Sequence, residues 1–352
     1  MSLKQKLVYI LPEYRENTAT HLQHNYEFLL RANEDFDIFL FIEKGEKPKN
    51  IQTVYRAKFR FMPLRVIELF CFLAVARMRG YKTFWTHYSF FGAILAPFFG
   101  RSFYWNCGMT WLYKRGRIEE YFFRLALRRS ILVTGTEGMK RQYISHYKLV
   151  ADRVEVMPNW ILLSRFTEWS KKRAEARVKL SIASDTRVVL FVHRLSKRKG
   201  ADFIMPVAKE FIHNDKVLFL VVGSGPLERE IKGINIRAVG EVSGQDIAMY
   251  FAAADVFFMP SEEEGFPHVL LEAMAVGVPI VVSDVGGVRE IMPPELQEYI
   301  VKQDKEKFKT LIEKLLGDQK RWEQISQIEQ QWVTRYSIEE ILNIFKEIVK
   351  EK

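Results

Sequence analysis

The chain has 352 residues, of which 48% are hydrophobic and 27% are charged, and its formal net charge at pH 7 is +10. This length suffices for about two domains with cores of their own, and the composition excludes a largely disordered chain. The first fifteen residues hold one short apolar run, residues 7–11, and no small-residue cleavage site, so they predict an opening strand rather than an export signal.

Short apolar runs alternate with segments of helical period along the whole chain, which predicts parallel sheets covered by helices. Strands are expected in the first half at residues 7–12, 36–43, 83–89, 102–107, 131–136 and 154–159. In the second half they are expected at residues 187–194, 217–225, 236–242, 255–261 and 279–284. The sequence therefore predicts an α/β fold with two similar halves.

The strand pattern breaks near residue 165, where a charged helical run over residues 170–179 begins. We therefore expect one domain at residues 1–165 and a second at residues 166–330. The last segment has helical period with no strand after it, so residues 331–352 are expected to form a helix that packs back toward the first domain.

The positive charge lies in the first half of the chain. Residues 1–170 hold 26 Lys and Arg against 15 Asp and Glu, whereas residues 171–352 hold 27 against 28. Residues 56–129 alone hold 14 against 3 and carry 20 of the 48 aromatic residues. Such a basic, aromatic-rich stretch is typical of a surface that docks on anionic lipid headgroups, although a buried helix over residues 66–76 with a basic rim explains the same pattern.

Three other classes of site find little support in the sequence. The charged residues within 61–105 exclude a membrane-spanning helix there, and no nucleic-acid-binding motif accompanies the basic charge of residues 56–129. Cys71 and Cys107 lie in apolar stretches, so we expect free thiols in a cytoplasmic protein and no zinc site. Asp35 and Asp37 precede a strand, and we interpret them as turn residues rather than metal ligands.

The stretch from residue 255 to residue 284 combines a buried strand, a loop, a helix and another strand. Pro267 is expected at the first helical position and Gly277 just past the helix end. Glu264 and Glu272 have seven residues between them, so one lies at the binding edge of the sheet and the other within the helix. The helix start attracts phosphate, and the two carboxylates can accept hydrogen bonds from hydroxyls, although both could instead be solvated surface acids.

A second basic loop strengthens the case for a phosphorylated ligand. In the stretch FVHRLSKRKGADF, Arg194 ends a strand and Lys199 precedes Gly200 and another helix. Two fixed cations in this position can neutralise a diphosphate. Lys197 and Arg198 are interpreted as solvated loop residues.

Four stretches in the second half, HRLSKRKG, VVGSGP, AVGEV and residues 254–290, occur in an order that resembles the retaining, nucleotide-sugar-dependent glycosyltransferases of family four. The likeness extends over about residues 188–290 and is thin in the first half. It implies the GT-B fold, in which two Rossmann-like domains face each other across a cleft.

The resemblance also implies roles for single residues. Glu264 would bind the hydroxyls of the donor sugar, Glu272 its ribose, and Arg194 with Lys199 its diphosphate. His87 resembles the first-domain histidine near the reacting carbon. The remaining donor-binding residues implied by the resemblance are Gly223, Val242, Gly265, Phe266, Pro267, His268 and Leu270.

Three parts of the sequence depart from the family pattern. Thr18, Ala19 and Thr20 stand where members commonly have a Gly-Gly loop, His193 stands where a Gly usually precedes the arginine, and Cys107 stands where a His-Gly pair is usual. These departures concern the acceptor side and the phosphate contacts rather than the class of reaction.

The function expected from these observations is retaining transfer of a sugar from a nucleoside diphosphate sugar to an acceptor hydroxyl, with no metal and no cofactor. A lipid-linked or membrane-proximal glycan is the preferred acceptor, and the expected location is the cytoplasm, peripheral on the inner face of the plasma membrane. Nucleic acid is not expected as a partner. A sugar-nucleotide epimerase with the same fold is the alternative, while a dehydrogenase is disfavoured because residues 223–228, GSGPLE, lack the third glycine.

Overall fold

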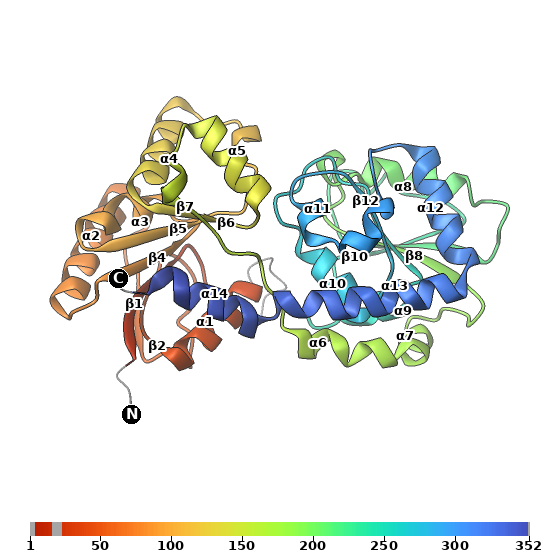
Figure 1. Ribbon diagram of the computed structural model, residues 1–352, viewed down its shortest axis with the longest axis horizontal. Coiled ribbons are helices and arrows are strands. Elements are labelled where there is room, and N and C mark those ends of the chain that lie inside the picture. The colour runs from red at the N-terminus through yellow and green to blue at the C-terminus, as the bar shows by residue number, and fades with distance from the viewer. Residues whose placement is uncertain (1–3, 16–22, 351–352) are drawn as a thin grey trace. The chain divides into compact units, whose positions relative to one another are not determined.

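The computed structural model describes residues 4–15 and 23–350. The chain forms two compact units, one comprising Met1–Pro158 with Ile341–Lys352 and the other comprising Asn159–Glu340. We refer to them as the first and second unit. Both are open α/β sheets with helices packed against them (Figure 1).

The first unit contains a seven-stranded sheet in the order β3-β2-β1-β4-β5-β6-β7. All of its neighbouring strands are parallel. The strands are β1 (Gln5–Leu11), β2 (Phe36–Ile42), β3 (Thr53–Arg56), β4 (Thr83–His87), β5 (Arg101–Trp105), β6 (Ile131–Thr134) and β7 (Val154–Val156). The helices between them are α1 (Gln23–Asp35), α2 (Met62–Met78), α3 (Phe90–Leu95), α4 (Arg117–Arg129) and α5 (Glu137–Tyr147).

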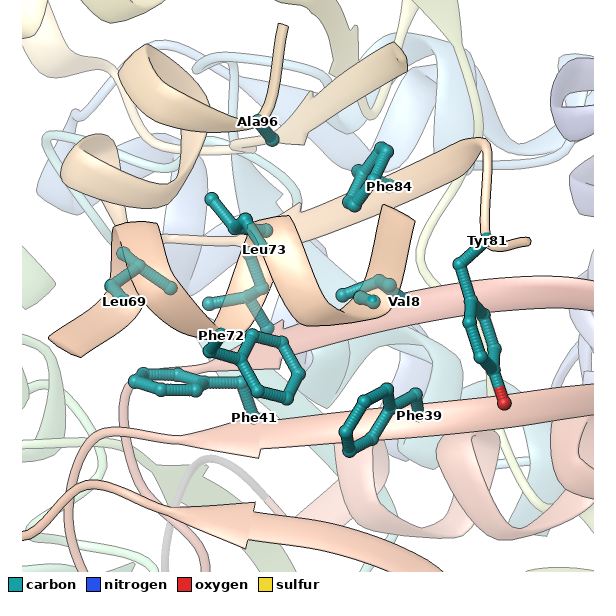
Figure 2. Close-up of a cluster of buried hydrophobic side chains, with 11 residues drawn as sticks. Val8, Phe39, Phe41, Leu69, Phe72, Leu73, Tyr81, Phe84 and Ala96 are labelled. Atoms are coloured by element: carbon teal, nitrogen blue, oxygen red, sulfur yellow. The ribbon is translucent and has the colours of Figure 1, made fainter. Parts of the chain in front are cut away.

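Helix α2 covers one face of this sheet. Phe72 packs against Phe39 and Phe41 of β2, with ring centroids 4.5 and 4.9 Å apart (Figure 2). The buried side chains of α2 recur at helical spacing, and those of each strand alternate between the two faces of the sheet. Glu68 is the buried acid of α2, and it accepts hydrogen bonds from the backbone N–H groups of Lys58 and Phe59, which fixes the loop before the helix.

The C-terminal helix, α14 (Ile338–Val349), packs on the first unit, as the sequence predicts. The Phe345 ring contacts Phe28, Phe36 and Trp85 edge-on, with centroids 5.3, 5.4 and 4.7 Å away. Lys346 Nζ lies 2.9 Å from Asp35 Oδ2. Helix α14, from the end of the chain, therefore covers part of the face of the first sheet that lies opposite α2.

The second unit contains a six-stranded parallel sheet in the order β10-β9-β8-β11-β12-β13. The strands are β8 (Arg187–Val192), β9 (Val217–Val222), β10 (Ile236–Gly240), β11 (Val256–Met259), β12 (Ile280–Ser283) and β13 (Ile300–Val301). The helices are α6 (Leu163–Thr167), α7 (Arg173–Lys179), α8 (Ile204–Lys209), α9 (Ile247–Ala253), α10 (His268–Val276), α11 (Val288–Ile291), α12 (Lys305–Gly317) and α13 (Gln319–Trp332). The order reverses direction at β8 and β11, which places a switch point between these two strands.

The expectation that Asp35 and Asp37 are turn residues is wrong. Asp35 ends α1 and Asp37 lies within β2, where it accepts a hydrogen bond from Tyr81 Oη at 3.1 Å, so neither is a turn residue. Cys71 and Cys107 are both free, as expected, and Cys71 is exposed on α2. Cys107 is buried, and burial raises the pKa of its thiol.

Candidate functional site

The loop after β8 forms one side of the candidate site. His193 and Arg194 follow β8, and the loop then turns through a short 3-10 segment, Lys197–Lys199, to Gly200. Gly200 has φ of +70°, and a Cβ at this position would lie 2.0 Å from the carbonyl oxygen of Pro260. Glycine is therefore required where the β8 loop crosses the loop after β11.

The loop after β11 forms the other side. It covers residues 260–267, between the end of β11 and the start of α10. The backbone N–H groups of Glu262 and Glu263 both donate to the Arg198 carbonyl, at 3.1 and 3.3 Å, and the Gly287 N–H donates to the Gly265 carbonyl at 3.2 Å. The β11 loop is thus held by the β8 loop on one side and by the segment after β12 on the other.

The carboxylate of Glu264 joins these two loops. Its side chain is 5% exposed, its Oε2 lies 2.8 Å from Lys199 Nζ, and its Oε1 lies 3.3 Å from His193 Nε2. Oε1 also accepts a hydrogen bond from Ser261 Oγ at 2.9 Å. Burial alone would raise the pKa of this carboxyl, but its contacts with His193 and Lys199 outweigh burial and lower the pKa to about 2. Glu264 is therefore ionised at neutral pH.

Arg194 and Lys199, expected from the sequence to act as a pair, have different surroundings. Lys199 is buried against Glu264, and its Nζ also donates to the Glu263 carbonyl at 3.4 Å. The Arg194 side chain is exposed and forms no ion pair within residues 4–15 and 23–350. The charge of Lys199 is thus already balanced by Glu264, and Arg194 is the cation available to an incoming anion.

Helix α10 presents its N-terminus at the same edge of the sheet. The helix begins at His268, one residue later than expected, and Pro267 is its N-cap. Gly277 ends the helix with φ of +83°. The first N–H groups of an α-helix have no partner within the helix and attract anions. The turn before the helix is fixed by Phe266, whose carbonyl accepts a hydrogen bond from Asn159 Nδ2 at 3.1 Å and whose ring packs edge-on against Tyr336.

Within α10, the predicted residues differ in what they can offer a ligand. His268 and Glu272 are four residues apart, so they share one face of the helix, and both are half-buried. Burial first, and the charge of Arg165 second, lower the pKa of His268 to about 3, so its ring is neutral at pH 7. Leu270 is fully buried, which leaves its backbone rather than its side chain for a ligand to contact.

The loops after β9 and β10 lie beside the β8 loop in the sheet order. Gly223 follows β9, and its N–H donates to the Gly240 carbonyl at the end of β10 at 2.7 Å. Val242, two residues past β10, is half-buried. Because all these strands are parallel, Gly223 and Val242 lie at the same carboxyl edge as Arg194 and Glu264.

Sequence reasoning did not identify three contributors to this site. Ser261 and Asn159 are isolated polar residues in the sequence, and nothing around them indicates a role. The one available indication is that Ser261 precedes Glu264 by three residues, a spacing from which its hydroxyl can donate to the carboxylate. His193 is visible in the sequence only as a departure from the family pattern. Its contact with Glu264 depends on how two separate loops meet.

In the first unit, His87 is the last residue of β4 and is fully buried. Its ring stacks on Trp105 with centroids 4.3 Å apart, and its Nδ1 lies 3.4 Å from Tyr9 Oη. The structure therefore places His87 in an aromatic cluster, and its role near a reacting carbon stays a prediction. Thr18, Ala19 and Thr20 lie outside the described residues.

The first unit also contains a cavity of about 180 Å³. It is lined by Pro12, Glu43, Arg65, Ser89 and several apolar and aromatic side chains, at the carboxyl ends of β1, β2 and β4. Glu43 Oε2 lies 3.5 Å from Arg65 Nη1, and Glu43 Oε1 accepts a hydrogen bond from Ser89 Oγ. Burial raises the pKa of Glu43, although Ser89 and Arg65 partly oppose this. The cavity is mostly apolar with one polar side.

Residues 172–332 match the family described as Glycosyl transferases group 1. These residues form a glycosyl transferases group 1 domain. It lies within the second unit and contains Arg194, Lys199, Glu264 and the other predicted donor-binding residues. His87 is the one predicted site residue outside it.

Curated relatives match parts of the chain. It is 34% identical over 136 residues to the putative teichuronic acid biosynthesis glycosyltransferase TuaC of Bacillus subtilis, covering 39% of this chain and 34% of that protein. It is 30% identical over 214 residues to the GDP-mannose-dependent monoacylated alpha-(1-6)-phosphatidylinositol monomannoside mannosyltransferase of Corynebacterium glutamicum, covering 54% of this chain and 56% of that protein. The matched segments thus span about a third to somewhat over half of these relatives.

A solved glycosyltransferase structure from Rickettsia africae aligns with 99% of this chain and 100% of its own, with a TM-score of 0.78 and 14% sequence identity. At this identity the likeness concerns the fold alone. Together with the group 1 domain, it confirms the GT-B architecture that the sequence motifs imply: two parallel-sheet Rossmann-like domains with a helical C-terminus.

Proposed function

We propose that this chain is a retaining glycosyltransferase that moves a sugar from a nucleoside diphosphate donor to an acceptor hydroxyl. The observation that carries the proposal is the buried Lys199–Glu264 ion pair beside the exposed Arg194. These residues lie at the carboxyl edge of the sheet, at a switch point where open α/β sheets bind ligands. The group 1 domain over the same residues supports this reaction.

The leaving diphosphate is the group that this site stabilises. Arg194 supplies a charge-assisted hydrogen bond, worth about 1.5–3 kcal/mol, and the N-terminus of α10 supplies unpaired N–H groups. As the bond between the sugar carbon and the diphosphate oxygen breaks, negative charge develops on that oxygen, so both interactions strengthen in the transition state. The acceptor oxygen forms its bond from the same face, and its proton passes to the departing phosphate.

The two glutamates bind the parts of the donor that do not react. Glu264 accepts a hydrogen bond from a hydroxyl of the donor sugar, and Glu272, farther along α10, accepts from the ribose diol. Both contacts orient the donor relative to Arg194 and the helix start. Because the protein supplies the positive charge opposite the diphosphate, the reaction needs no divalent ion and no cofactor.

We further propose that the acceptor is lipid-linked or close to a membrane. Helix α2 and the residues before it expose large apolar side chains, among them Phe61 at 67%, Ile67 at 59% and Met78 at 79%. Basic residues of the same segment, including Lys58, Arg60 and Arg77, fit anionic headgroups, each worth about 1 kcal/mol near the surface. The cavity beside α2 combines an apolar wall with Glu43 and Arg65, which suits the polar head of an amphiphile.

The membrane proposal concerns a peripheral surface. In the described part of the chain no helix is both long enough and apolar enough to cross a bilayer. The name of the Corynebacterium relative states a GDP-mannose donor and a phosphatidylinositol-based acceptor, which supports testing this class of molecules first. The inner leaflet of the plasma membrane, with its anionic lipids, is the surface we propose.

The test of the function starts from donor binding. Purified protein is screened by thermal shift against UDP- and GDP-sugars in the presence of EDTA, and the stabilising donor is then incubated with and without lipid acceptors. Glycosylated lipid formed only when acceptor is present, with EDTA in the buffer, supports the proposal. An isomerised sugar formed from donor alone would identify an epimerase, and no stabilisation by any donor would contradict both.

A further inference from the structure

His193 lies between the two residues that the proposed function assigns to the donor sugar and the diphosphate. Its Nε2 is 3.3 Å from Glu264 Oε1, and its Nδ1 accepts a hydrogen bond from the backbone N–H of Arg194 at 2.8 Å. Both contacts are made by the imidazole, so they depend on a histidine at this position.

The two contacts define which ring nitrogen of His193 carries the proton. A backbone N–H can only donate, so Nδ1 accepts and carries no hydrogen in the neutral ring. The proton of the neutral ring is then on Nε2, which faces the Glu264 carboxylate at 3.3 Å. The imidazole thus links the backbone of Arg194 to the carboxylate of Glu264.

The backbone of His193 is held by the neighbouring strand β9. The His193 N–H donates to the Val222 carbonyl at 3.1 Å, and Gly223 packs so closely that a Cβ there would lie 2.0 Å from the His193 carbonyl oxygen. The side chain is 23% exposed, so one edge remains open to solvent. The backbone of His193 is therefore fixed, and the ring is oriented by its contacts with the Arg194 N–H and Glu264.

The contact also limits what Glu264 can offer a ligand. An ionised carboxylate has about four lone-pair positions. Among the described residues, Oε1 accepts a hydrogen bond from Ser261 and also faces His193 Nε2, whereas Oε2 faces Lys199 Nζ alone. Oε2 therefore has one described partner and Oε1 has two, whereas a glycine at residue 193 would leave Oε1 with one.

We propose that His193 is a positioning residue of the donor site, which orients Glu264 for a single hydroxyl of the donor sugar and fixes the backbone that carries Arg194 beside the diphosphate. This inference rests on the proposed function. It adds that His193 restricts the choice of sugar as well as strengthening donor binding. A change at residue 193 therefore alters the ratio of activities on two donor sugars, which a purely structural role would leave unchanged.

Three substitutions at this position separate the two contacts. His193→Ala removes both, His193→Asn retains an oxygen close to the position of Nδ1 for the Arg194 N–H, and His193→Gln retains a donor that can reach Glu264. His213→Ala is the matched control, because His213 is an exposed histidine of the same unit outside the site. Each variant is assayed for KM and kcat with the best donor of the wild type and with its epimer at one sugar hydroxyl.

We expect His193→Ala to raise the donor KM about tenfold, which is the effect of losing one hydrogen bond to a charged group. We also expect the ratio of kcat/KM for the best donor to kcat/KM for its epimer to become smaller. The Asn and Gln variants should fall between Ala and wild type, and imidazole added to His193→Ala should lower its KM again. His213→Ala should match the wild type in every measurement.

The outcomes distinguish this inference from the proposed function. An active wild type with an unchanged KM and donor ratio in His193→Ala would overturn the inference and leave the function intact. A raised KM that neither imidazole nor the Asn and Gln variants improve would also overturn it, because the loss would then reflect damage to the fold. A wild type that turns over no nucleotide sugar would instead refute the proposed function.

Discussion

Lys199 Nζ lies 2.8 Å from Glu264 Oε2, and both side chains are at most a tenth exposed. This ion pair connects the loop after β8 to the loop after β11. Removing one partner of a buried pair leaves an uncompensated charge, whereas removing an exposed side chain leaves the fold nearly unchanged. The two cations predicted for the diphosphate therefore differ in what they do for stability.

We expect Lys199→Ala to lower the free energy of unfolding by about 3–5 kcal/mol and Arg194→Ala to change it by less than about 0.5 kcal/mol. Urea unfolding of the two variants beside the wild type measures both values. Equal losses in the two variants would contradict the contrast between a buried, paired lysine and an exposed arginine.

The depressed pKa of Glu264 predicts a dependence of stability on pH. The ordinary value of 4.5 is lowered to about 2 in the folded protein, so the stabilising contribution is complete above about pH 4.5 and is lost as the pH falls toward 2. A difference of this size corresponds to about 3 kcal/mol. Unfolding free energies measured between pH 6 and 3 should fall more steeply for the wild type than for Glu264→Gln, and parallel curves would count against the assignment.

The backbone of Gly286 lies close against the backbone of Glu264. Its φ is +51°, and a Cβ there would lie 1.7 Å from the Glu264 carbonyl oxygen, whereas a Cβ at Gly317 would meet no atom within 4 Å. Gly286→Ala should therefore lower the melting temperature and weaken donor binding, while Gly317→Ala should do neither. A Gly286→Ala protein with normal donor affinity would show that the backbone of Glu264 can shift without consequence.

The exposed face of α2 predicts binding to anionic vesicles. The double variant Phe61→Ser, Ile67→Ser should lose co-flotation with vesicles of phosphatidylglycerol and phosphatidylcholine, because it removes apolar side chains that would insert among the headgroups. Ile234→Ser is the control, since Ile234 is 87% exposed but lies in the second unit. Flotation that fails in the wild type, or that persists in the double variant, would exclude this surface as the membrane contact.

The sequence predicts the elements that are buried on both faces. The runs at β8, β9, β11 and β12 are continuous and apolar because helices cover both sides of a parallel sheet, and each was predicted close to its observed range. Strands β3 and β13 were missed. Strand β3 lies at a sheet edge, and its sequence TVYR is only partly buried and contains no apolar run. Strand β13 has two residues, too few for a periodic signal.

The candidate site was predictable to the extent that its residues belong to local motifs. Glu264, Lys199 and the start of α10 are each marked by their neighbours in sequence. Two features of the site arise where loops about 70 residues apart in the sequence meet, so no local pattern encodes them. One is the difference in surroundings between Arg194 and Lys199, and the other is the contact between His193 and Glu264. For α2 the sequence left two interpretations open, a docking surface and a buried helix, because a mostly apolar helix is compatible with both.

The most direct test of the central claim is donor turnover by Arg194→Ala, measured in the presence of EDTA beside Lys197→Ala. Lys197 is an exposed cation of the same loop and forms no part of the proposed site. The account predicts that the wild type and Lys197→Ala turn over donor at the same rate with chelator, while Arg194→Ala loses about ten- to a hundredfold in kcat/KM. Full activity of Arg194→Ala, or loss of wild-type activity on chelation, would contradict it.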